Sequence, residues 1–195
     1  MLRLGLTGSI ASGKSTVGRM LAELGVPLIA ADDVVHELYR GAAAAPIEAL
    51  FPGTTRNGEV DRAALSRTLV KAPGKLAALE AVVHPLVRAR IRAFLDEAER
   101  HGAKLAVADI PLLFETGADY GLDAVLVVTA PEAAIRERAL SRPGMSVEKL
   151  EAILARQMPQ AEKRKRADYL IDTGASLDDT RRQVVDLVTR LGQGT

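Results

Sequence analysis

The sequence predicts an α/β fold, in which a mostly parallel five-stranded sheet has helices on both faces. Three observations predict it. The chain opens with a strand-like run, a glycine-containing loop and an amphipathic helix. Four further apolar runs follow, and predicted helices separate most of them from one another. Strands that alternate with helices pair in parallel through right-handed crossovers, which gives this fold class.

The first strand and the first helix are predicted from their apolar spacing. Leu2, Leu4 and Leu6 alternate as in a strand. After the loop, four apolar residues share one face of a helix: Val17, Met20, Leu21 and Leu24. Gly25 then serves as a C-terminal stop. A strand, a loop and a helix in this order aim a helix N-terminus at the loop, where an anion can bind.

The loop itself has the phosphate-binding pattern of Gly, four residues and then Gly-Lys-Ser, from Gly8 to Ser15. Gly8 and Gly13 allow backbone conformations that a Cβ would disfavour, so that successive N–H groups can turn around an anion. Lys14 is expected to reach the β- and γ-phosphates, and the Ser15 hydroxyl to ligate Mg²⁺. A glycine turn without a ligand would need neither Lys14 nor Ser15.

The second strand is predicted at 27–30 and ends just before Asp32, where a helix begins that stops near Gly41. The alanine run at 42–45 is interpreted as a helix end or a loop. Residues 51–60 contain two glycines, a proline and an asparagine, which is typical of a loop.

Three helices follow without a strand among them. Asp61 caps the first of these helices, the second runs from about 73 to 83, and the third from 86 to about 100. His84 and Pro85 are predicted to interrupt the helical pattern between the last two. A run of helices between strands is interpreted as an insertion into the α/β framework.

Two buried strands at 105–110 and 124–129, and a short last strand at 169–172, complete the sheet. Ligands of such sheets bind beyond the carboxyl ends of the strands. Candidate site residues lie at or just after the carboxyl ends of four of the predicted strands, and we expect them to converge on one edge: residues 9–15, Asp32, Asp109 and residues 129–131.

The helices of the second half are bounded by turn and capping residues. One begins near Pro131, and the loop 141–146 breaks it. Ser146 then caps a further helix, which continues to about Met158. Ser176 opens the final helix, with Asp179 three residues on as a variant of the capping box.

The composition bounds the class of protein. The 195 residues suffice for one compact domain with insertions, and the absence of cysteine excludes disulfides and thiolate metal sites. The first apolar run is a strand rather than a signal peptide, and no run approaches about 20 apolar residues, so a cytoplasmic protein without a membrane span is expected. A net charge of +1, three Tyr, three Phe and no Trp argue against a nucleic-acid partner. No feature implies a protein partner.

Two aspartates are candidates for chemistry. Asp32 would lie beside the γ-phosphate, where its carboxylate could accept or orient a hydroxyl proton; the alternative is that it caps the following helix. Asp109 would hold Mg²⁺, directly or through water, and its alternative is a strand-end cap before Pro111. His84 could contact a substrate, or be a helix-break residue satisfied by the backbone.

The segment 136–166 contains nine Lys or Arg against four Glu in a nearly neutral chain. A basic excess across a helix, a loop and a helix resembles a lid that closes over a triphosphate. Arg142, in the loop, is predicted to stabilise charge on the transferred phosphoryl group. The run from Lys163 to Arg166 is interpreted instead as a solvated helix end.

Five segments together resemble a known family across essentially the whole chain: 8–16, Ala31-Asp32, His84-Pro85-Leu86, 109–115 and 167–172. The most specific is Ile-Pro-Leu-Leu-Phe-Glu at 110–115, which phosphate-loop kinases in general do not share. The chain resembles the dephospho-CoA kinases. The resemblance implies ATP-dependent phosphorylation of the ribose 3′-hydroxyl of dephospho-CoA, with ATP and dephospho-CoA as small-molecule partners and Mg²⁺ as cofactor.

The resemblance also implies a three-layer P-loop kinase architecture within one domain. Its core would comprise residues 1–60, 101–130 and 167–195, its helical acceptor-binding insertion about 61–100, and its lid about 131–166. The site residues carried over by resemblance are grouped by role. For ATP they are Gly8, Ala11, Ser12, Gly13, Lys14, Ser15, Thr16, Arg138 and Arg142; for the acceptor, Asp32, His84, Leu112, Phe114 and Arg156; for the metal, Ser15 and Asp109.

The chain departs from the family pattern at four places. Ser9 and Ala11 stand where the family usually has glycine, and Ala30 replaces the first of two aspartates, which leaves Asp32. Thr173 replaces an asparagine, so how adenine is held is open. A kinase of a nucleoside or nucleoside monophosphate would need the same loop. A guanine-dependent switch is disfavoured because Asn57, the only Asn, lies in an unsuitable loop.

Overall fold

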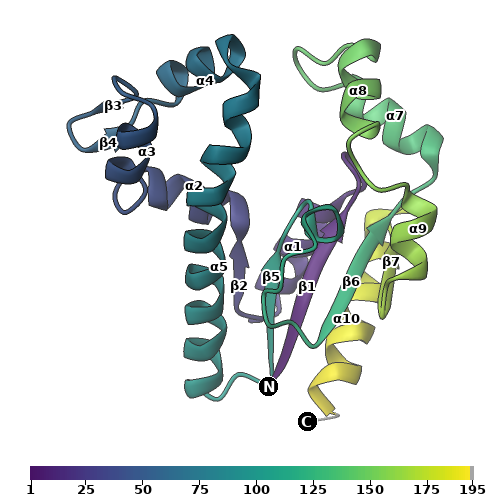
Figure 1. Cartoon of the computed structure of the whole chain (residues 1–195). Coiled ribbons are helices and arrows are strands. Elements are labelled where there is room, and N and C mark those ends of the chain that lie inside the picture. Colours follow the sequence, from purple (N-terminus) through teal and green to yellow (C-terminus); the bar gives the residue numbers. More distant parts are fainter. Residues whose placement is uncertain (194–195) are drawn as a thin grey trace. The chain divides into compact units, whose positions relative to one another are not determined.

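The predicted fold class is confirmed by a computed structural model, which describes residues 1–193 (Figure 1). Five strands form one sheet in the order β2-β5-β1-β6-β7. Pairings of β1 with β5, of β1 with β6 and of β6 with β7 are parallel. The strands run from Leu2 to Gly8 (β1), Leu28 to Ala30 (β2), Leu105 to Asp109 (β5), Ala124 to Thr129 (β6) and Tyr169 to Asp172 (β7).

Two compact units make up the chain, one from Met1–Ile29 with Leu95–Thr195 and one from Ala30–Phe94. The first unit contains the phosphate loop and the basic segment 131–166. The second unit begins at residue 30, whereas the sequence groups residues up to 60 with the core. Residues 194 and 195, the end of the predicted core range, lie outside the described residues.

The core of the first unit lies between the sheet and two helices. Helices α1 (Lys14–Glu23) and α10 (Leu177–Gln193) contact each other. Three of the four residues of the predicted α1 stripe, Val17, Met20 and Leu21, are buried; they pack with Val184, Leu187 and Leu191 of α10 and with the strands. The fourth, Leu24, is exposed. At the start of α10, the Ser176 and Asp179 side chains bond as the predicted capping box, with Ser176 Oγ 2.6 Å from Asp179 Oδ2.

Four shorter helices of the first unit follow β5 and β6 along the chain. They are α6 (Leu113–Thr116), α7 (Glu132–Leu140), α8 (Val147–Leu154) and α9 (Gln160–Lys165). Ser146 caps α8 as predicted, since its Oγ accepts from Lys149 N. The prediction that this helix continues to about Met158 is wrong, because it ends at Leu154. Helix α6 was not predicted, and of α9 only the end at 163–166 was; four and six residues are too few to show helical periodicity.

The second unit is helical with one hairpin. Its elements are α2 (Ala31–Tyr39), α3 (Ala44–Leu50), β3 (Thr55–Arg56), β4 (Glu59–Val60), α4 (Arg62–Lys71), a 3₁₀ turn (Pro73–Lys75) and the first part of α5 (Leu76–Arg100). Asp61 caps α4 as predicted, accepting from Ala64 N at 2.9 Å. The loop predicted at 51–60 contains the β3–β4 hairpin. Asn57 and Gly58 both have positive φ, the two-residue turn that joins such strands.

Helix α5 is continuous through Pro85, so the predicted break at His84 and Pro85 is wrong. Proline removes one backbone hydrogen bond and crowds the preceding turn. Apolar residues nonetheless follow one face on both sides of the proline and are buried: Leu79, Val83, Val87, Ile91 and Leu95. Burial of this uninterrupted stripe outweighs the local cost of the proline.

Lys163 is fully buried, so the prediction that the run 163–166 is a solvated helix end is wrong for its first residue. Its Nζ lies 2.8 Å from Glu115 Oε1, and Met158 N donates to the same carboxylate oxygen at 2.8 Å. Burial raises the pKa of Glu115, but the hydrogen bonds from Lys163 and Met158 outweigh burial and hold the pKa below its ordinary value. The pair joins the segment after β5 to α9.

Replacing Lys163 by Met is expected to lower the free energy of unfolding at pH 7 by about 3 kcal/mol, because it leaves the Glu115 carboxylate buried without its cation. Because the pKa of Glu115 is lowered in the folded state, its contribution is present above the ordinary carboxyl pKa and is lost as the pH falls through the folded pKa. The deficit measured by urea denaturation should therefore shrink on acidification. Lys165→Met, at an exposed pair with Glu162, is the control; an equal deficit there would contradict the prediction.

Candidate active site

The phosphate loop leaves β1 at Gly8 and enters α1 at Lys14. Gly13 is the N-cap of α1, and no side chain among residues 1–193 caps this helix. The amides of Thr16 and Val17 both turn back onto the Gly13 carbonyl. Uncapped amides at a helix N-terminus, together with the helix dipole, form a site for an anion.

The loop requires its two framing glycines, Gly8 and Gly13, for different reasons, and the predicted reason holds only for Gly13. Gly13 has φ 87°, a left-handed conformation that favours glycine. Gly8 does not have positive φ, so the prediction that its backbone freedom is needed is wrong. A Cβ at Gly8 would instead lie 2.6 Å from Ser12 Oγ and 2.8 Å from Val128 O, closer than real contacts allow.

Ala11 is the second residue of the loop in the left-handed region, with φ 57°. This conformation costs a non-glycine residue about 1–2 kcal/mol. Its methyl group is buried against Ala139 of α7 and Leu150 of α8. The apex of the loop is thus packed on the two helices that follow β6.

Ala11→Gly is expected to change the free energy of unfolding by less than about 1 kcal/mol, because relief of the left-handed backbone offsets the lost methyl burial and the added chain entropy. Ala139→Gly removes a buried methyl of the same cluster from a helix, and should cost about 2 kcal/mol. Urea denaturation of both variants tests the comparison, and equal losses would show that the φ of Ala11 carries no strain.

Lys14 points from the loop to the end of β5, where its Nζ forms an ion pair with Asp109 Oδ1. Both side chains are mostly buried, and Asp109 is the last residue of its strand, as predicted. The register places Leu6 opposite Asp109, so the loop and this carboxylate lie at the same edge of the sheet. A cation and a carboxylate beside uncapped amides suit a phosphate with a bound divalent cation.

The hydroxyl groups of the loop fit such a ligand. Ser15 is exposed in the first turn of α1, next to Lys14. Ser12 Oγ is buried and has no hydrogen-bond partner within residues 1–193. A serine hydroxyl and one carboxylate, completed by phosphate oxygens and water, are the kind of donor set that Mg²⁺ uses.

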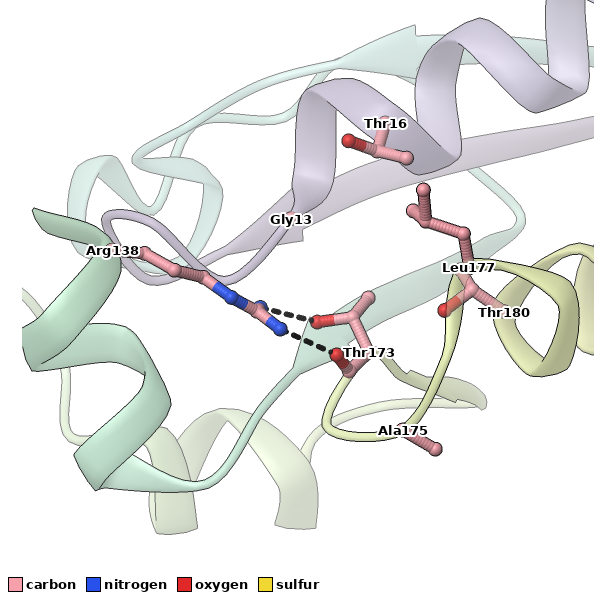
Figure 2. Close-up of a pocket in the computed structure, with 7 residues that line it drawn as sticks. All are labelled: Gly13, Thr16, Arg138, Thr173, Ala175, Leu177 and Thr180. Atoms are coloured by element: carbon pink, nitrogen blue, oxygen red, sulfur yellow. Dashed lines mark hydrogen bonds between the residues drawn. The ribbon is translucent and has the colours of Figure 1, made fainter. Parts of the chain in front are cut away.

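Arg138 of α7 and Thr173, which follows β7, lie on the other side of the loop (Figure 2). Arg138 Nη1 donates to Thr173 Oγ1 at 3.1 Å, and Nη2 to Thr173 O at 2.8 Å. These two residues line a cavity of about 210 Å³ together with Gly13, Thr16, Ala175, Leu177 and Thr180. The cavity adjoins the N-terminus of α1, at the side of the loop away from β5.

Other predicted residues of the first unit lie on its surface. Arg142 and Arg156 are exposed, Arg142 in the turn after α7 and Arg156 in the turn after α8. Neither side chain has a hydrogen bond or ion pair within the described part of the chain. Leu112 is also exposed, and Phe114 in α6 is partly buried beneath the Arg166 guanidinium, 6.0 Å from its ring centre.

The second unit holds Asp32 and His84. Asp32 is exposed in the first turn of α2, and the N-cap of that helix is Ala30 without a side-chain bond. The alternative that Asp32 caps the helix is therefore wrong. His84 is partly buried within α5 rather than at a helix break.

Two glutamines, Gln157 and Gln160, make contacts that were not predicted. Gln157 Oε1 accepts from Ile10 N at the tip of the phosphate loop, at 3.0 Å. Gln160 bonds both the N–H and the C=O of Ala130, at the end of β6. A single glutamine side chain gives no periodic signal in the sequence, so these two contacts could not be predicted from it.

Comparison with known proteins places these features in a family. The family model described as dephospho-CoA kinase matches residues 2–179. A protein named dephospho-CoA kinase from Brucella melitensis is 56% identical over 191 residues, covering 98% of this chain and 96% of that protein.

Two solved structures are similar over nearly the whole chain. A dephospho-CoA kinase from Campylobacter jejuni is 26% identical with a TM-score of 0.72, and covers 98% of both chains. The protein TT1252 from Thermus thermophilus is 39% identical with a TM-score of 0.79, covering 100% of this chain and 98% of that one.

Proposed function

This chain belongs to the dephospho-CoA kinase family, and we propose that it transfers the γ-phosphoryl group of ATP to the ribose 3′-hydroxyl of dephospho-CoA, giving coenzyme A and ADP. The observation that carries the proposal is the arrangement at the end of β1: an uncapped helix N-terminus with Lys14 paired to Asp109. This arrangement supports a triphosphate as the donor, and the family supports dephospho-CoA as the acceptor.

The residues of the loop would hold the donor. Residues 11–16 would surround the phosphates, while Lys14 would leave Asp109 and reach the β- and γ-oxygens. The Ser15 hydroxyl and Asp109 would hold Mg²⁺. Bound there, the cation would neutralise charge between the β- and γ-phosphates. Gly8 would keep the loop close to β6.

The basic segment 131–166 would act as a lid. Arg142 is exposed and lacks a partner within residues 1–193, so its guanidinium is available to a phosphate. We assign it to charge stabilisation on the transferred group, and Arg138, which borders the cavity beside Gly13, to the nucleotide. Adenine would occupy that cavity.

Asp32 would align or deprotonate the attacking hydroxyl. It is exposed, and no ion pair or hydrogen bond engages its side chain within residues 1–193. His84, Leu112, Phe114 and Arg156 would contribute to the acceptor site. The partners are thus small molecules.

None of the helices described between residues 1 and 193 is long and apolar enough to cross a membrane. The donor ATP points to a cytoplasmic enzyme, and neither a nucleic acid nor a protein partner is part of the proposal.

One assay tests the acceptor. ADP formation should be measured with MgATP and a panel of dephospho-CoA, adenosine and nucleoside monophosphates, and without acceptor. We expect kcat/KM for dephospho-CoA to exceed that for the other acceptors by at least about a hundredfold, the scale at which unpaired polar groups reject an analogue. Rapid hydrolysis without acceptor, or preference for another acceptor, would contradict the proposal.

A further inference from the structure

Thr173 occupies a junction between three parts of the first unit. It directly follows β7, is buried, and its N–H donates to Thr129 O at 2.8 Å, which continues the pairing of β6 with β7. Its backbone is therefore fixed by the sheet. The side chain points from this fixed position towards both the phosphate loop and α7 (Figure 2).

The Thr173 hydroxyl bonds groups on both sides. Its Oγ1 lies 2.7 Å from Ser12 O and 3.3 Å from Thr129 O, and it accepts from Arg138 Nη1 at 3.1 Å. A hydroxyl has a single proton, and the shorter distance directs that proton to Ser12 O. Arg138 is held twice, because its Nη2 also donates to Thr173 O at 2.8 Å.

The bond to Ser12 O sets the direction of the next amide. A trans peptide is planar, so its C=O and its N–H point in opposite directions. With Ser12 O turned towards Thr173, the N–H of Gly13 points away from Thr173. The Thr173 side chain also packs closely on Gly13, because a Cβ added to Gly13 would lie 3.0 Å from Thr173 Oγ1 and Cγ2.

We propose that Thr173 is a positioning residue for nucleotide binding: it fixes the orientation of the Ser12–Gly13 peptide in the phosphate loop and at the same time holds the Arg138 guanidinium at the neighbouring cavity. The assignment rests on the proposed function for the identity of the nucleotide. Thr173 acts through these two groups, and its own hydroxyl is already engaged by Ser12 and Arg138.

The test compares variants of Thr173 by calorimetric titration with ADP, which needs no acceptor. Thr173→Val keeps the shape and removes the hydroxyl, so that Ser12 O loses its donor and Arg138 one acceptor. We expect the Kd for ADP to rise about tenfold, since an unsatisfied buried polar group costs about a factor of ten or more in an equilibrium constant. Thr173→Ser keeps the hydroxyl and should restore the Kd to within about threefold.

Thr54→Val is the matched control. Thr54 is a buried threonine of the second unit whose Oγ1 donates to Phe51 O at 2.6 Å. It should lose thermal stability as Thr173→Val does, but keep the Kd for ADP. A Thr173→Ala variant provides the same comparison if valine prevents folding.

A wild-type Kd for ADP in folded Thr173→Val, or equal weakening in Thr173→Ser or Thr54→Val, would overturn the positioning role. The outcome for the acceptor is separate. A wild-type chain that binds ADP but leaves dephospho-CoA unphosphorylated would refute the proposed function, while the ADP titrations would still decide the role of Thr173.

Discussion

Asp32→Asn is expected to lower kcat with dephospho-CoA by at least about a hundredfold while the Kd for ATP stays nearly unchanged, because a general base contributes on this scale to the chemical step. Asparagine has nearly the same size as aspartate but cannot accept the hydroxyl proton. Asp32 lies exposed at the start of α2 and caps no helix, so the substitution removes no structural bond. Steady-state kinetics with ADP detection, together with calorimetric ATP titration, measure both quantities.

Asp33→Asn is the matched control, since Asp33 is the next residue, equally exposed and in the same first turn of α2. It should keep kcat within about twofold, as a surface substitution away from the chemistry does. If turnover is unchanged in Asp32→Asn, or falls equally in Asp33→Asn, Asp32 has no part in the mechanism.

Lys14→Met is expected to lower kcat/KM for ATP by at least about a thousandfold, the upper range for removal of one preorganised charge from the transition state. Methionine retains the apolar length of the side chain but cannot contact a phosphate. The Kd for ATP should rise as well, since Lys14 is the cation of the loop. Single-turnover kinetics at saturating ATP would separate the loss in binding from the loss in the chemical step.

Lys165→Met controls for the removal of a positive charge, because Lys165 is exposed and pairs with Glu162 on its own helix. It should leave kcat/KM for ATP unchanged. A loss of less than tenfold in Lys14→Met would contradict the role assigned to the phosphate loop.

The sheet and its ligand-binding edge could be predicted from the sequence because their signals are local. The apolar runs, the glycine loop and the caps at Asp61, Ser146 and Ser176 are each legible within a few residues. The parallel topology then places Gly8, Asp109 and Thr129 at one edge, and the observed register agrees. The pairing of Lys14 with Asp109 follows from that convergence.

Long-range packing accounts for what the sequence could not predict. Lys163 is indistinguishable by composition from its basic neighbours, and only the fold buries it against Glu115. Pro85 favours a break locally, yet the buried stripe of α5 keeps the helix continuous. Gln157 and Thr173 reach the phosphate loop from 147 and 161 residues away.

The phosphorylated position on the acceptor tests the central claim most directly. The purified chain is incubated with MgATP and dephospho-CoA, and the product is examined by ³¹P NMR and mass spectrometry. We expect one phosphomonoester on the ribose 3′-oxygen, formed in equal amount to ADP, and no product from a 3′-deoxy analogue of dephospho-CoA. Phosphate released into solution, or a phosphate carried at any other position, would contradict the account.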